Sequence, residues 1–115
     1  MTEEEALTAF SDYDKALIET IQSNASDCNL LGNHLLQLIN AHHVSLKRAF
    51  AYLNTVDRYS QTGQVFFEKY DESRPSRRNR TLMKAIDDCG KTPDVKEFKR
   101  LYSDLMLSDI VPKSI

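Results

Sequence analysis

The sequence is poor in the residues that interrupt helices and form turns. Its 115 residues include only three Gly, three Pro and no Trp, whereas 41% are hydrophobic and 28% are charged. So few turn-forming residues favour a few long helices over many short strands. The sequence has no run approaching the roughly 20 apolar residues of a membrane span, and its acidic start lacks the apolar core of a signal peptide. These absences predict no membrane association and a cytoplasmic location, or an intracellular one in a host.

Cysteine and histidine are also scarce, with two and three residues respectively. Cys28 and Cys89 are far apart in the sequence and lack metal-ligand spacing, so we expect both to be reduced, buried thiols. The adjacent residues His42 and His43 would point about 100° apart on a helix, and the two rings could not bind one metal from the same face. The sequence therefore predicts no metal site and no cofactor.

A regular spacing of small or apolar residues at every third or fourth position runs through the middle of the chain. Its positions are Cys28, Gly32, Leu35, Ile39, His42, Leu46, Ala49, Leu53, Val56, Ser60, Gly63, Phe67 and Tyr70. This coiled-coil spacing predicts one long central helix at about residues 27–71. Gly63 is its weakest position, because an interior Gly costs about 1 kcal/mol, and a break there is the alternative. Further apolar residues beside the spacing predict a helical bundle rather than a two-stranded coiled coil.

Three other helices are predicted at about residues 3–22, 77–89 and 93–107. Thr2 and Glu5 have the spacing of a capping box, and a stripe of apolar residues follows them. Pro75 separates the central helix from the next helix, and Thr92-Pro93-Asp94 is typical of a helix start. The sequence thus predicts a single all-α domain over residues 1–115, a bundle of four helices, with residues 108–115 as an extended and partly mobile tail.

The main concentration of charge is a group of four arginines near the start of the third predicted helix. They are Arg74, Arg77, Arg78 and Arg80. Positive charge at a helix N-terminus is unfavourable, so another group should offset it. The acidic residues Glu68, Asp71 and Glu72 could do so, as could an acidic protein surface, an anionic lipid or nucleic-acid phosphate. The preferred interpretation is a solvated loop with local ion pairs. Among external partners, the sequence pI of about 5.9 argues against nucleic acid, and a protein with an acidic surface is the preferred hypothesis.

Charge is distributed unevenly along the chain. Residues 1–57 contain three Lys/Arg against eight Asp/Glu, a net charge of −5, and residues 58–115 contain twelve against nine, a net charge of +3. Two copies with antiparallel central helices would bring opposite charges together. This arrangement predicts a homodimer. Its expected contact surface is the second half of the central spacing: Val56, Ser60, Gly63, Phe67 and Tyr70.

No catalytic motif is present. The acidic pairs diverge on a helix, no Ser, Cys or Lys lies in a nucleophile motif, and no Gly-rich loop could hold a phosphate. The segment Ala41–Lys47 resembles the histidine phosphotransfer family, helical bundles with an exposed histidine midway along a helix, and this resemblance implies phosphorylation of His43. In that family a Lys stands three residues after the phosphorylated His, and a Gly comes next. In this sequence Leu46 stands three residues after His43, and Lys47 stands four residues after it.

Together these patterns favour a non-enzymatic protein-interaction module, such as an adaptor, an inhibitor or a regulatory subunit. Apolar helix faces and the arginine-rich loop would bind its partner. Two alternatives remain open. The first is a regulatory protein that binds nucleic acid through residues 74–80, and the second is a phosphotransfer domain that uses His43. If neither applies, His42 is a half-buried polar residue that sets helix register.

Overall fold

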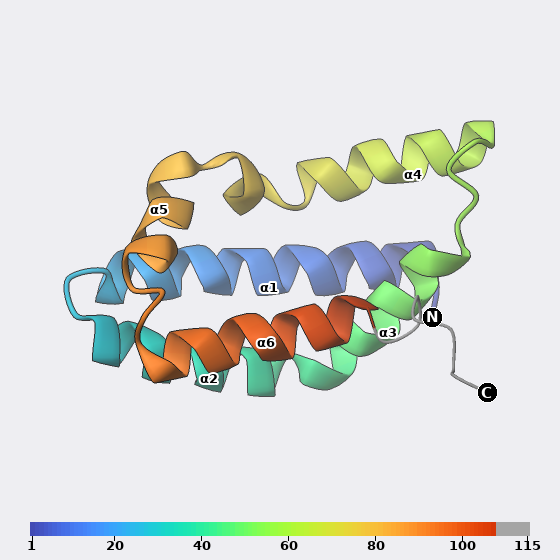
Figure 1. Ribbon diagram of the computed structural model, residues 1–115. Coiled ribbons are helices and arrows are strands. Elements are labelled where there is room, and N and C mark those ends of the chain that lie inside the picture. The colour runs from blue at the N-terminus through green and yellow to red at the C-terminus, as the bar shows by residue number, and fades with distance from the viewer. Residues whose placement is uncertain (108–115) are drawn as a thin grey trace.

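The computed structural model describes residues 1–107, which contain helices and no strands (Figure 1). The elements are α1 (Glu3–Asn24), α2 (Cys28–Ala41), α3 (His43–Thr55), α4 (Gln61–Glu72), the 3₁₀ turn η1 (Pro75–Arg78), α5 (Arg80–Asp88) and α6 (Pro93–Leu107). The all-α prediction is confirmed. The predicted tail at 108–115 lies outside the described residues. No helix within residues 1–107 is both long enough and apolar enough to span a membrane.

Helix α1 begins at the capping box that the sequence predicted. The Thr2 hydroxyl accepts a hydrogen bond from the Glu5 backbone N–H at 3.1 Å, and the Thr2 N–H donates to the Glu5 carboxylate at 3.0 Å. These bonds give partners to two backbone N–H groups at the start of the helix that have no acceptor within the helix. Asp27 begins α2 in a similar way, since its carboxylate accepts from the N–H groups of Asn29 and Leu30.

The prediction of one helix over residues 27–71 is wrong, because the structure divides this segment into α2, α3 and α4. The first break is small: His42 leaves the helical region at φ −103° and ψ 5°, and α3 continues in roughly the same direction as α2 (Figure 1). The backbone ladder is partly kept there, since His42 N–H donates to Leu38 and His42 C=O accepts from Leu46. A break at a single residue leaves the apolar spacing in phase on both sides.

The second break reverses the chain. Val56 is extended, and the turn that follows leads into α4, which runs antiparallel to α3 (Figure 1). Ser60 caps α4 by accepting from the Gly63 N–H at 2.9 Å. Gly63 is therefore in the first turn of α4, where a Cβ atom would overlap the carbonyl oxygen of Asp57. The helix does break near Gly63, but the break lies before this residue, at Val56–Ser60. Glycine is needed at position 63 because the Asp57 backbone approaches too closely for a side chain.

Helix α1, rather than the 28–70 segment, occupies the centre of the fold. Helices α2 and α3 pack against one side of α1, with α6 also packed on them, while α4, η1 and α5 lie along another side of α1 (Figure 1). Phe10 of α1 joins the two sides, because its ring contacts Phe50 of α3 and Tyr70 of α4 at centroid distances of 5.0 and 4.8 Å. The apolar spacing from Cys28 to Tyr70 continues through the reversal because the helices before and after it both face α1.

The expectation of two reduced thiols is also wrong. Cys28 at the start of α2 and Cys89 at the end of α5 form a disulfide, with Cα atoms 5.3 Å apart. The sequence separation of 61 residues concealed this pairing, since only the packing of both helices on α1 brings the two ends together. Stable disulfides are rare in the cytosol, so the cysteines no longer support the predicted cytoplasmic location.

Candidate functional site

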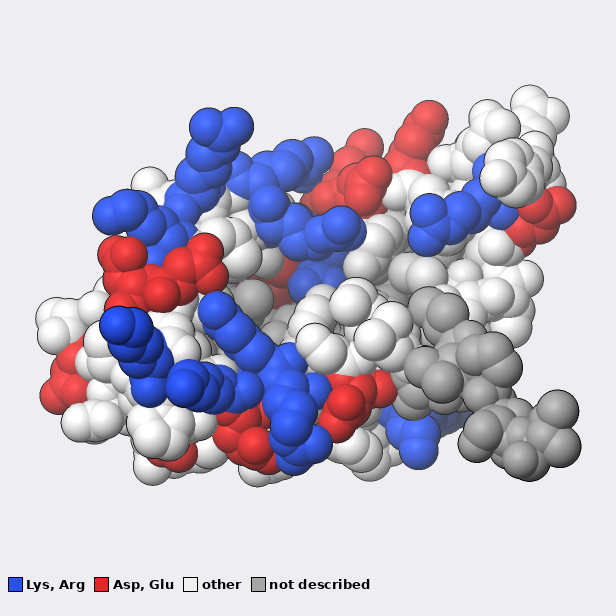
Figure 2. All heavy atoms as spheres, in the orientation of Figure 1, with Lys and Arg blue, Asp and Glu red and all other residues white. Residues whose placement is uncertain are grey.

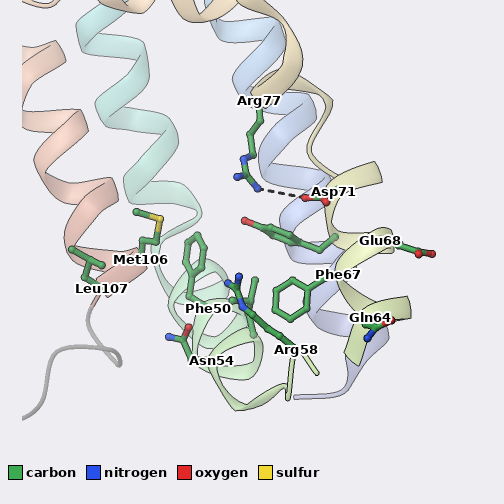
Figure 3. Close-up of a pocket in the computed structure, with 12 residues that line it drawn as sticks. Phe50, Asn54, Arg58, Gln64, Phe67, Glu68, Asp71, Arg77, Met106 and Leu107 are labelled. Atoms are coloured by element: carbon green, nitrogen blue, oxygen red, sulfur yellow. Dashed lines mark ion pairs between the residues drawn. The ribbon is translucent and has the colours of Figure 1, made fainter. Parts of the chain in front are cut away.

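The candidate site is a groove between α4 on one side and α3 and the end of α6 on the other (Figure 3). Its volume is about 640 Å³. The lining residues are Phe50, Leu53, Asn54, Arg58, Gln64, Phe67, Glu68, Tyr70, Asp71, Arg77, Met106 and Leu107. The reversal at Val56–Ser60 creates this groove, because it separates α4 from α3 instead of continuing the same helix.

Apolar side chains from three helices lie in the groove. Phe67 of α4 faces Phe50 of α3 across it, and Met106 and Leu107 of α6 border it (Figure 3). Met106 is 37% exposed and Leu107 is 42% exposed. Aromatic and methionine side chains exposed together in a concave surface are typical of protein-binding sites.

Two arginines line this groove (Figure 3). The Arg58 guanidinium lies over the Phe67 ring, 4.6 Å from its centroid. Arg77 comes from η1, with a side chain that is 52% exposed and a nitrogen 3.8 Å from an Asp71 carboxylate oxygen (Figure 3). An exposed ion pair of this length contributes little to stability. The Arg77 guanidinium therefore remains able to bind a carboxylate from a partner.

Arg74 has a different role from the one that the sequence predicted. Its side chain is 3% exposed, and its Nε donates to Oδ1 of Asp14, which is 1% exposed, at 3.0 Å. The other Asp14 oxygen accepts from the Ser76 backbone N–H at 3.0 Å, and the Ser76 hydroxyl also binds this carboxylate. Arg74 is thus buried and paired within the fold, where it holds η1 against α1, and it is not part of an exposed arginine surface.

Two tyrosines complete this buried network. Arg74 donates to the Tyr102 hydroxyl at 3.0 Å and to the Tyr70 hydroxyl at 3.4 Å. Burial raises the pKa of Tyr70, and burial also raises the pKa of Tyr13, whose ring lies beside Arg74. Burial alone would lower the pKa of Arg74, but its contacts with Tyr102, Tyr70 and Asp14 outweigh burial and raise it. The phenols of Tyr13 and Tyr70 therefore stay neutral and the Arg74 guanidinium stays charged at physiological pH.

The other three arginines are exposed. Arg77 and Arg78 end η1, and Arg80 is the first residue of α5. The predicted helix 77–89 begins later than expected, because Asn79 caps α5 by accepting from the Leu82 N–H. Figure 2 shows basic side chains gathered over η1, α5 and the first half of α6. Residues 74–100 contain nine Lys/Arg and four Asp/Glu, a net charge of +5.

The predicted self-association residues do not form one continuous helix face. Gly63 and Tyr70 are buried, Val56 is extended, and Ser60 is the N-cap of α4. Only Phe67 contributes a partly exposed side chain to the groove. The expected contact surface along a long helix is therefore absent from residues 1–107, because the reversal places its members on a turn and on α4.

The two adjacent histidines lie at the α2–α3 break. The half-buried His42 ring contacts Tyr13, with centroids 5.8 Å apart, and His43 is exposed as the first residue of α3. Within residues 1–107, no three His, Cys, Asp or Glu side chains are grouped to hold a metal ion. Phosphorylation of His43 stays a prediction.

Sequence reasoning missed Asp14, although a signal for it was present. Asp14 is four residues after Phe10 and three before Leu17, which places it on the apolar face of α1. An acidic residue on a buried face requires a partner, since a buried unpaired charge is very costly. This position could have indicated a buried ion pair, although not which of fifteen basic residues would form it. Met106 and Leu107 had no comparable signal.

Comparison of the chain with protein-family models, with curated proteins and with solved structures gives no match.

Proposed function

We propose that this protein is a non-enzymatic interaction module whose groove binds an acidic amphipathic helix of a partner protein. The observation that carries the proposal is the exposure of Phe67, Met106 and Leu107 in one groove that Arg58 and Arg77 also line. Helix α4 has 12 residues and is about 18 Å long, which gives room for roughly three turns of a bound helix. Apolar residues of the partner would bind in the groove, and its carboxylates would bind the two arginines.

The proposal is tested by selecting helical peptides from a phage-displayed library on the purified protein. We expect enriched peptides with apolar residues at i, i+3 or i+4 and i+7, together with Asp or Glu. Binding is then measured by fluorescence anisotropy. Met106→Ser should weaken it about tenfold, because burying such a side chain contributes about 1–2 kcal/mol. Arg77→Gln should weaken binding and reduce its dependence on salt.

Leu30→Ser is the matched control, since Leu30 is an exposed apolar residue on α2 that does not line the groove. Equal binding by the Met106→Ser and Leu30→Ser variants would contradict the proposal. A second copy of the chain is the alternative occupant, because α1 contains five Asp/Glu besides the buried Asp14, against one Lys, and could bind the basic side chains over η1, α5 and α6. Light scattering distinguishes this outcome: a dimer that Met106→Ser dissociates would identify the groove as a self-association site.

Nucleic-acid binding is a second candidate, and the charge of residues 74–100 favours it. Besides the buried Arg74, residues 74–100 contain eight basic residues that could neutralise phosphates. Substitution of Arg77, Arg78 and Arg80 with Ala should then abolish a salt-sensitive gel shift. The absence of any shift at low salt would exclude this candidate.

A further inference from the structure

A second cavity, of about 320 Å³, lies between α5 and α6. Helix α1 and η1 also contribute to its wall. Its apolar lining includes Met83 and Ile86 from α5 and Phe98 from α6. This volume is at the lower end of the range of about 300–1,000 Å³ for small-molecule sites. The cavity can therefore hold a compact apolar group.

Two tyrosine hydroxyls give this cavity unused hydrogen-bond donors. Tyr70 and Tyr102 both line it, and each hydroxyl oxygen accepts a hydrogen bond from Arg74. Within residues 1–107, neither hydroxyl donates a hydrogen bond to the protein. A tyrosine hydroxyl is both a donor and an acceptor, so both can still donate to a bound group. An acceptor is therefore the complementary ligand chemistry.

The charges around the cavity favour a negatively charged acceptor. Arg74, Arg77 and Lys99 line it, and among the described lining residues Asp87 is the one carboxylate, paired with Lys99 at 3.2 Å. These lining charges sum to +2; outside the lining, the Asp14 carboxylate offsets Arg74 at 3.0 Å and the exposed Asp71 carboxylate lies 3.8 Å from Arg77. Arg77 has the longest ion pair of the three cations, 3.8 Å to the exposed Asp71, whereas Arg74 and Lys99 are paired at 3.0 and 3.2 Å.

We infer that this cavity binds a small amphipathic carboxylate, with an alkyl or aryl part beside Met83, Ile86 and Phe98. The carboxylate accepts hydrogen bonds from Tyr102 and Arg77. This inference does not rest on the proposed function, although the cavity shares Tyr70, Arg77 and Met106 with the groove. A bound carboxylate at Arg77 would compete with a peptide carboxylate for the same guanidinium.

The test compares three ligands that have the same alkyl chain and different head groups: octanoate, octan-1-ol and octylamine. Each is titrated into the full chain and followed by calorimetry and by amide chemical shifts. We expect octanoate to bind at one site, at least tenfold more tightly than the alcohol or the amine. The largest shifts should fall in α5, η1 and the middle of α6.

Two variants separate the head-group contact from the apolar contact. Arg77→Gln should weaken octanoate at least tenfold and leave octan-1-ol nearly unchanged. Met83→Trp should fill the cavity and weaken both ligands. Lys84→Gln is the matched control, because it removes the same charge from a residue of α5 that does not line the cavity.

Three results would overturn the inference. They are equal binding of octanoate and octan-1-ol, an equal loss in the Arg77→Gln and Lys84→Gln variants, or shifts confined to α3 and α4. The last result would place the ligand in the groove instead. None of these results bears on whether selected peptides bind through Met106, so the two proposals can fail separately.

Discussion

The Cys28–Cys89 disulfide leads to the sharpest prediction for stability. It joins the start of α2 to the end of α5. Among the described elements, α5 packs mainly on α1 and η1, and it has no substantial contact with α2 or α6. The disulfide therefore adds to two other connections between α5 and the α2 side of the fold, the loop at residues 89–92 that leads into α6 and the Asp87–Lys99 ion pair. Opening it should destabilise the whole chain and should loosen α5 first.

The magnitude follows from the length of chain that the bond closes. Cys28 and Cys89 are separated by 61 residues. Closing a loop of that length in the unfolded chain corresponds to about 4 kcal/mol of folding free energy at 25 °C. With a urea m-value of about 2 kcal/mol per M, this loss corresponds to a midpoint lower by about 2 M. For a chain of this size, 4 kcal/mol is a large part of the total stability.

The assay is urea unfolding of three samples: oxidised protein, protein kept in a phosphine reductant, and the Cys28→Ser/Cys89→Ser double variant. Alkylation before reduction checks that the first sample has no free thiols. We expect the reduced protein and the double variant to share a lower midpoint, and amide exchange to be fastest in α5. Equal midpoints for oxidised and reduced protein would refute this reasoning about the stability that the disulfide provides.

Three further predictions concern single positions. Asp14→Asn should lower the free energy of unfolding by about 3–5 kcal/mol, because it leaves Arg74 buried without a counter-charge. Chemical denaturation measures this loss. The exposed control Asp12→Asn should change stability by less than about 0.5 kcal/mol. Gly63→Ala should destabilise by more than about 1 kcal/mol in the same assay, although the substitution usually stabilises a helix, since the new Cβ would overlap backbone; a gain in stability would show that the turn can shift. Burial raises the pKa of Tyr13 in the folded chain, so the stability from its neutral form is complete below the ordinary pKa of about 10 and falls as pH rises beyond it, by up to about 1.4 kcal/mol per pH unit. Unfolding measured from pH 8 to 11 should show this slope, and Tyr13→Phe should reduce it, with Tyr70 contributing the remainder because burial raises its pKa as well.

Much of the helical structure follows from local sequence. The capping box at Thr2 and the Thr92-Pro93-Asp94 start predicted α1 and α6 closely, and α6 spans Pro93–Leu107 as expected. Such signals depend on hydrogen bonds and backbone angles within a few residues, so they act the same way in any fold. The predicted start at residue 77 was less accurate, because Asn79 competes as a cap and the preceding residues form a 3₁₀ turn.

Apolar spacing was a weaker guide to helix length. The spacing runs unbroken from Cys28 to Tyr70, yet the chain reverses at Val56–Ser60. The spacing shows only which side of each helix faces the core. Two antiparallel helices that both pack on α1 can therefore follow one continuous spacing. The groove exists only because of this reversal, so its lining residues could not be predicted from the spacing.

The sequence by itself therefore determined an all-α protein, the positions of the first and last helices, and a basic segment near residue 80. The tertiary structure alone decided that Arg74 pairs with Asp14 60 positions away, that Cys28 bonds Cys89, and that Phe67 and Met106 share a groove. The physical reason is the distance along the chain over which each interaction acts. Caps and apolar stripes are short-range properties of one segment, whereas pairings between distant residues depend on how several helices pack together on α1.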